Sequence, residues 1–137
     1  MAVVEELLRA EADGTISFGN HKLAEKAKVE DFKHAGDLLK VKTYSAMTKL
    51  EKNGMFLYES VPGTSVLNFA EREDGVEFIV EGDEDAQITI GLTDDTEYEV
   101  FVDGKSTGTM KTGLGGKLSL SVELETAGEV PVKVERV

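Results

Sequence analysis

The chain has 137 residues, of which 40% are hydrophobic, with no cysteine, no tryptophan and a net charge of −12. This length fits one domain with its own core, and the lack of cysteine excludes disulfides, thiolate metal sites and cysteine nucleophiles. The acidic excess disfavours nucleic acid and membrane surfaces as partners, because their phosphate groups would repel it.

The N-terminal segment shows no basic leader followed by an apolar run, so we expect no secretion signal and a cytoplasmic location. No stretch approaches the roughly 18–20 apolar residues of a membrane span, which predicts a soluble protein. Val4–Arg9 and His21–Ala27 are rich in helix-favouring residues but are short and lack clear caps. They allow for short helical turns near the N-terminus.

The first 64 residues contain three pairs typical of tight turns before apolar runs: Asp13-Gly14, Gly36-Asp37 and Asn53-Gly54. Residues 61–64, Val-Pro-Gly-Thr, predict a type II turn, because Pro sets φ at its second position and Gly accepts positive φ at its third. This turn also marks a candidate sub-boundary within a single domain spanning residues 1–137.

From Ser65 onward, apolar and polar residues alternate between turn residues, which is typical of half-buried antiparallel strands. Asp103-Gly104 predicts a two-residue type I′ hairpin, since both residues tolerate positive φ. Seven strands are expected: 65–72, 76–81, 86–92, 96–102, 105–112, 117–124 and 130–137.

Two details of this half concern glycine and proline. Gly113-Leu114-Gly115-Gly116 superficially suggests a phosphate loop, but an alternating strand follows it instead of a helix, so we interpret it as a tight or bulged hairpin. Pro131 lacks a backbone donor, which predicts that the last strand lies at a sheet edge.

Together these patterns predict an all-β fold, an antiparallel β-sandwich of nine to twelve strands whose first 60 residues complete the sheets of the second part. The alternation also predicts which side chains face the core: Ile16, Phe18, Val41, Leu57, Val66, Phe69, Phe78, Val80, Ile88, Ile90, Tyr98, Val100, Val102, Leu118, Leu120, Val122, Val132 and Val134.

Candidate chemistry is sparse. His21 and His34 stand in no metal or catalytic motif, so both are interpreted as surface or half-buried residues. A Ser-His-Asp arrangement is compatible with the composition, but no G-x-S-x-G elbow occurs. We predict no catalytic residue and no cofactor. Two acidic loops that flank strand 86–92 contain weak candidates for a structural calcium ion: Asp83, Asp85, Asp94 and Asp95.

Part of the C-terminal half is similar to accessory modules of other proteins. The segment 96–122, with its strand, Asp-Gly turn, strand and glycine-rich connection, resembles the C-terminal β-sandwich modules of bacterial polysaccharide-degrading enzymes. The resemblance covers about 40 residues at most and implies a non-catalytic fold or a carbohydrate-binding role.

Four further segments resemble a family of short bacterial proteins often labelled endosialidase: 13–19, 49–55, 58–64 and 113–118. That label implies a sialidase-type glycoside hydrolase. Such an enzyme needs an arginine cluster for the sialic acid carboxylate, hence a pocket that collects at least two of Arg9, Arg72 and Arg136.

The residues favour a non-catalytic structural or interaction protein that self-associates or binds a protein partner, since exposed sheet edges suit assembly. The alternative is a carbohydrate-binding module, for which Tyr44 and Tyr58 are the weak candidate ligand residues. A glycan-active enzyme is the third interpretation.

Overall fold

A computed structural model describes residues 3–137 and contains thirteen β-strands and no helix within that range. The strands are β1 (Leu8–Ala10), β2 (Ile16–Phe18), β3 (Ala27–His34), β4 (Asp37–Tyr44), β5 (Met47–Lys52), β6 (Met55–Val61), β7 (Ser65–Arg72), β8 (Gly75–Glu81), β9 (Ala86–Gly91), β10 (Glu97–Val102), β11 (Lys105–Lys111), β12 (Lys117–Val122) and β13 (Val130–Arg136). All seven strands predicted after Ser65 are present, but the total exceeds the nine to twelve expected.

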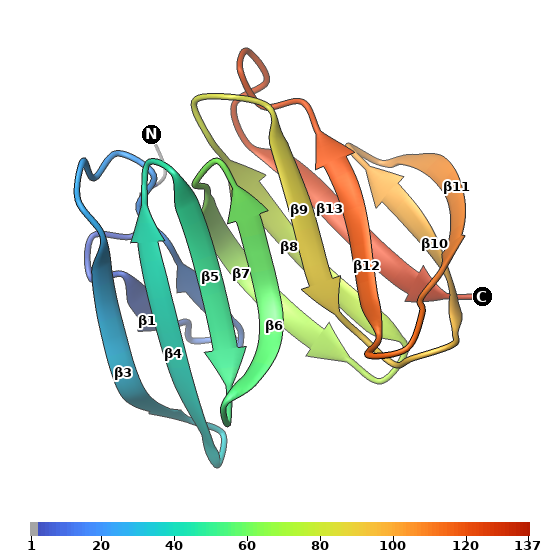
Figure 1. Cartoon of the computed structure of the whole chain (residues 1–137), viewed down its shortest axis with the longest axis horizontal. Coiled ribbons are helices and arrows are strands. Elements are labelled where there is room, and N and C mark those ends of the chain that lie inside the picture. Colours follow the sequence, from blue (N-terminus) through green and yellow to red (C-terminus); the bar gives the residue numbers. More distant parts are fainter. Residues whose placement is uncertain (1–2) are drawn as a thin grey trace.

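The strands form two antiparallel sheets packed face to face, which confirms the predicted β-sandwich (Figure 1). Sheet A has the order β1-β2-β7-β8-β13-β10-β11, and sheet B has the order β12-β9-β6-β5-β4-β3. Strands from both sides of residues 61–64 contribute to each sheet and to one core cluster. The described residues contain no helix long and apolar enough to cross a membrane.

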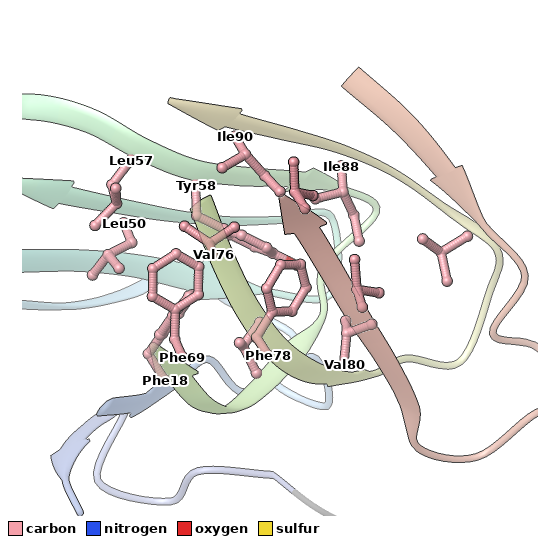
Figure 2. Close-up of a cluster of buried hydrophobic side chains, with 14 of the residues drawn as sticks. Phe18, Leu50, Leu57, Tyr58, Phe69, Val76, Phe78, Val80, Ile88 and Ile90 are labelled. Carbon is pink, nitrogen blue, oxygen red and sulfur yellow. The ribbon is translucent and has the colours of Figure 1, made fainter. Parts of the chain in front are cut away.

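The core lies between the sheets and is centred on Tyr58, which makes edge-to-face contacts with Phe18, Phe69 and Phe78 at ring-centroid distances of 5.2, 6.2 and 5.7 Å (Figure 2). Such geometry stabilises aromatic pairs beyond the burial of their area. Every side chain predicted to face the core is buried, except Val102, which is partly buried against it.

Local turn chemistry explains the hairpins. Asp103 and Gly104 have φ values of 55° and 81°, and Asn53 and Gly54 have 53° and 78°. Positive φ at both central positions is the signature of a type I′ turn, whose twist matches that of paired strands. The predicted hairpins at these two sites are confirmed.

The helical turns allowed for at the N-terminus do not form. Val4–Arg9 instead leads into β1, and the backbone of Val4 and Leu7 hydrogen-bonds across to Gly19 at 3.0 Å. A helix of one or two turns is unstable by itself, so these inter-segment bonds prevail. The turn at 61–64 also differs from the prediction, because Gly63 does not have the positive φ that the third position of a type II turn requires. The Val61–Pro62 peptide bond is cis.

The prediction that the last strand lies at an edge is wrong, because β13 lies between β8 and β10. The Pro131 carbonyl accepts a hydrogen bond from the Asp103 amide in the β10–β11 turn at 2.8 Å. In an antiparallel strand the nitrogen of a residue points to the same side as its carbonyl. The Pro131 nitrogen, which carries no hydrogen, therefore faces the β10–β11 turn beyond the end of β10, so its lack of an N–H costs the sheet no hydrogen bond between paired strands.

The glycine-rich segment 113–116 is not a hairpin turn, because β11 belongs to sheet A and β12 to sheet B. The segment carries the chain between the sheets and passes close to the β9–β10 loop. A Cβ atom on Gly116, whose φ is +72°, would lie 2.0 Å from the Leu92 carbonyl oxygen. Glycine is required there for close approach of two backbones.

Candidate functional site

The structure brings one serine, one histidine and one aspartate into line. His21 Nδ1 lies 2.7 Å from Ser65 Oγ, and His21 Nε2 lies 3.6 Å from Asp83 Oδ1. His21 precedes β3, Ser65 begins β7, and Asp83 follows β8, so the alignment joins three segments far apart in sequence. Serine, histidine and aspartate follow one another as in a hydrolase triad, but the two ring nitrogens have exchanged partners, because in a triad Nε2 faces the serine and Nδ1 faces the aspartate.

This alignment is closed to substrate. Ser65 is fully buried, and the His21 side chain is only 1% exposed. The expectation that His21 is a surface or half-buried residue is therefore wrong. Burial lowers the pKa of His21, and Asp83 opposes that effect only in part. A nucleophile must reach the reacting carbon of its substrate, which a sealed Ser65 cannot do. The Ser65–His21 contact therefore ties the segment before β3 to β7, whereas His21 Nε2 has no hydrogen-bond partner among the described residues and Asp83 pairs with Lys22 instead.

A second buried polar group holds the β6–β7 connection against sheet B, beside this alignment. The Tyr58 hydroxyl and Ser60 Oγ each lie 2.8 Å from Thr64 Oγ1, and Thr48 Oγ1 donates to the Thr64 carbonyl at 2.7 Å. Burial raises the pKa of Tyr58, which keeps its hydroxyl neutral. Because Tyr58 is fully buried, it cannot contribute to an exposed sugar-binding face as expected; Tyr44 is half-buried at the end of β4.

The calcium candidates have other contacts. Asp83 pairs with Lys22 at 2.6 Å, Asp85 accepts the amides of Leu124 and Glu125, and Asp95 pairs with Lys111. Asp94 lies in the same exposed loop as Asp95, at the other end of β9 from Asp83 and Asp85. Within residues 3–137, no three acidic or histidine side chains converge to hold a metal ion.

A cleft of about 430 Å³ opens between the β1–β2 turn, the β3–β4 turn and β7. Its inner lining is apolar and includes Phe69, and its rim carries His34, Arg72 and the Lys52–Glu71 ion pair of 2.7 Å. Arg72 is the sole one of the three arginines in this lining and pairs with Glu77, while Arg9 pairs with Glu6 and Glu11. The cleft therefore does not collect the arginine pair that a sialic acid carboxylate would need.

The segment that contains β3, β4 and β5 is basic, unlike the rest of the chain. Residues 22–52 contain eight lysines against five acidic residues, a net charge of +3, so the rest of the chain carries −15. Lys28 on β3 lies opposite Lys42 on β4, which in turn lies opposite Lys49 on β5. We call these three residues the lysine row.

Like charges directly opposite each other on neighbouring strands repel, so the lysine row carries an energetic cost. Lys28 and Lys49 are offset by Glu30 and Glu51 at 3.2 and 3.6 Å. Lys42, at the centre, makes no ion pair with any residue that the structure describes. Lys42 therefore presents an uncompensated positive charge at the centre of the row, whereas Lys49 also lies opposite Glu59 on β6.

The opposite charge gathers at one end of the sandwich. The β8–β9 loop and the β12–β13 loop lie together at the upper end in Figure 1, joined by the hydrogen bonds of Asp85 to Leu124 and Glu125. Residues 82–85 and 123–129 contain six acidic and no basic residues; we call these six the acidic tip: Asp83, Glu84, Asp85, Glu123, Glu125 and Glu129.

Sequence reasoning identified the first acidic loop but missed the lysine row and the second loop of the acidic tip. A count of charges by segment would have found the basic stretch 22–52, whereas the meeting of two loops separated by about forty residues has no local signal. Comparisons with protein-family models, with curated proteins and with solved structures find no match. The fold class, an antiparallel β-sandwich, is therefore what defines this protein.

Proposed function

We propose that this chain is a non-catalytic interaction module that associates with further copies of itself. The observation that carries the proposal is the separation of charge on one small sandwich: residues 22–52, which contain β3, β4 and β5, carry +3, whereas the rest of the chain carries −15. Complementary charged surfaces guide association and fix its register. The sealed state of the Ser65–His21 pair supports a role without catalysis.

The sheet edges favour association through charged surfaces over strand addition. Edge strand β1 has only three residues, and both β3 and the β10–β11 pair contain bulges. Short, bulged and charged edges are how sandwiches avoid pairing with other sheets.

The proposal is tested by size-exclusion chromatography with light scattering over a range of protein concentrations. Salt is held at about 0.15 M, where the Debye length of about 8 Å screens whole-molecule repulsion but not contacting groups. We expect a mass that rises above the 14.9 kDa of one chain as concentration increases. A constant monomer mass up to millimolar concentration would contradict self-association.

A carbohydrate-binding module is the second candidate function, and one observation favours it. The Tyr44 ring lies at the end of the β4 strand that carries Lys42, with Lys26 Nζ 5.7 Å from the ring centroid. An aromatic ring beside free lysine charge suits a sugar that bears carboxylates. A glycan array tests this function: binding of acidic glycans that Tyr44→Ala abolishes would support it, and an array without any signal would reject it.

A further inference from the structure

We infer that self-association is head to tail, with the lysine row of one copy docked on the acidic tip of the next. The inference rests on the proposed function and names the two surfaces that perform it. The row lies on a sheet face, whereas the tip lies at the end of the strands, so one molecule presents both at once (Figure 1). A contact between two different surfaces builds either a closed ring or an open chain, and in an open chain each of the two end copies keeps one surface free.

The chemistry of the two surfaces is complementary. Lys42 has no counter-ion within the described residues, whereas Lys28 and Lys49 pair with Glu30 and Glu51 on their own strands. On the tip, Glu84, Glu125 and Glu129 are exposed and have no ion pair among the described residues. Docking would supply carboxylates to the lysines and lysines to the carboxylates, and it would relieve like-charge repulsion on both surfaces.

The tip is also built to hold its shape. Asp85 Oδ1 accepts the Leu124 amide at 2.9 Å and the Glu125 amide at 3.1 Å, which ties the two loops together. Lys22 pairs with Asp83 on the side of the tip that faces the segment before β3. The exposed glutamates therefore sit on a pre-organised surface, which reduces the entropy lost on binding.

A two-fold contact would have to use both surfaces in one interface. In such an interface residue i of one copy contacts residue j of its partner and j contacts i, so row and tip would have to belong to one continuous patch. The row lies on the face of β3, β4 and β5, whereas the tip lies at the strand ends in the β8–β9 and β12–β13 loops. This separation favours a head-to-tail contact, in which each copy uses its row toward one neighbour and its tip toward another.

The test is a complementary charge exchange. One variant, Lys42→Glu/Lys49→Glu, changes the charge of the row from +3 to −1. A second, Glu84→Lys/Glu123→Lys/Glu125→Lys/Glu129→Lys, changes the charge of the tip from −6 to +2. Each variant alone then carries two surfaces of like sign, and we expect its self-association to weaken by on the order of tenfold or more. An equimolar mixture restores association, because the acidic row of the first variant meets the basic tip of the second.

A matched control separates position from total charge. Lys105→Glu/Lys111→Glu on β11 changes the net charge by the same amount as the row variant, at two exposed residues of a distant edge strand. We expect this control to associate like the wild type. Circular dichroism and thermal melting verify that all three variants fold.

The outcomes distinguish the two proposals. If the wild type never exceeds monomer mass, the proposed function fails and this inference falls with it. If the wild type associates but the control substitutions weaken self-association as much as the row substitutions do, the contact lies elsewhere and only this inference is overturned. The same holds if the equimolar mixture of the row and tip variants does not recover association. Loss of acidic-glycan binding by the row variant, with self-association unchanged, would also overturn it and assign the row to a carbohydrate.

Discussion

The buried hydroxyl of Tyr58 gives a quantitative test of how the core is held. Tyr58→Phe keeps the ring and its edge-to-face contacts with Phe18, Phe69 and Phe78 but deletes the hydrogen bond to Thr64 Oγ1 at 2.8 Å. Thr64 Oγ1 keeps its contact with Ser60, so no partner is left unsatisfied. One neutral hydrogen bond contributes about 1 kcal/mol to the free energy of unfolding, and we expect a loss of that size.

Thr64→Val has a larger expected effect. It removes the same bond and also the contact of Ser60 with Thr64, so the buried Tyr58 hydroxyl keeps only its interaction with Ser60. Buried hydroxyls that lose hydrogen bonds cost about 1–3 kcal/mol, so this variant is expected to lose about 2–3 kcal/mol. The double variant Tyr58→Phe/Thr64→Val no longer carries the tyrosine hydroxyl that has lost a partner. It should therefore be more stable than the sum of the single effects predicts, by about 1 kcal/mol.

Urea unfolding followed by circular dichroism measures all four proteins, and an unchanged slope with denaturant shows that the variants alter stability and not compactness. The expected loss for Tyr58→Phe corresponds to a fall in melting temperature of roughly 2–5 °C for a chain of this size. Strictly additive effects in the double variant, or a Tyr58→Phe protein as stable as the wild type, would refute the network.

Three further predictions concern the loops and the buried histidine. Gly116→Ala should destabilise the fold by more than about 1 kcal/mol, since its Cβ would meet the Leu92 carbonyl at positive φ, whereas Gly113→Ala, with open space around it, should be nearly neutral in the same urea assay. Burial lowers the pKa of His21 in the folded protein, so as the pH falls the unfolded chain takes up a proton at His21 before the folded chain does. The free energy of unfolding should therefore keep its full contribution from His21 above about pH 6.5 and decrease as the pH drops below it. His21→Gln should reduce this pH dependence in thermal melts between about pH 7 and about pH 5.5. Asp85→Ala, which frees two amides, should cost about 1–2 kcal/mol and speed amide hydrogen exchange at Leu124.

The sequence alone determined the strands, because their signals are local. In Lys117–Val122 the side chains of Leu118, Leu120 and Val122 repeat every second residue, and this period places them on one face of any strand. Asp103-Gly104 likewise fixes a hairpin through the φ values that these two residues accept. Strand positions, core side chains and the type I′ turns therefore followed from neighbours in the chain.

Only the tertiary structure decided which strands share a sheet and which distant residues meet. No residue near Pro131 in the sequence indicates that its nitrogen, which carries no hydrogen, faces the point where β10 has ended. Likewise, no residue near Gly113 indicates that the chain crosses from one sheet to the other there. The Ser65–His21 contact spans 44 residues, and the acidic tip joins loops about as far apart.

The position of the lysine row depends on a single extra residue in β3. From the β3–β4 turn the register pairs Phe32 with Leu39, but a bulge at Asp31, whose φ is 56°, shifts it so that Lys28 lies opposite Lys42. One extra residue in one strand changes which side chains oppose each other across a ladder. Periodicity specifies the strands, whereas bulges and sheet order arise from packing the whole chain, and they place these charges side by side.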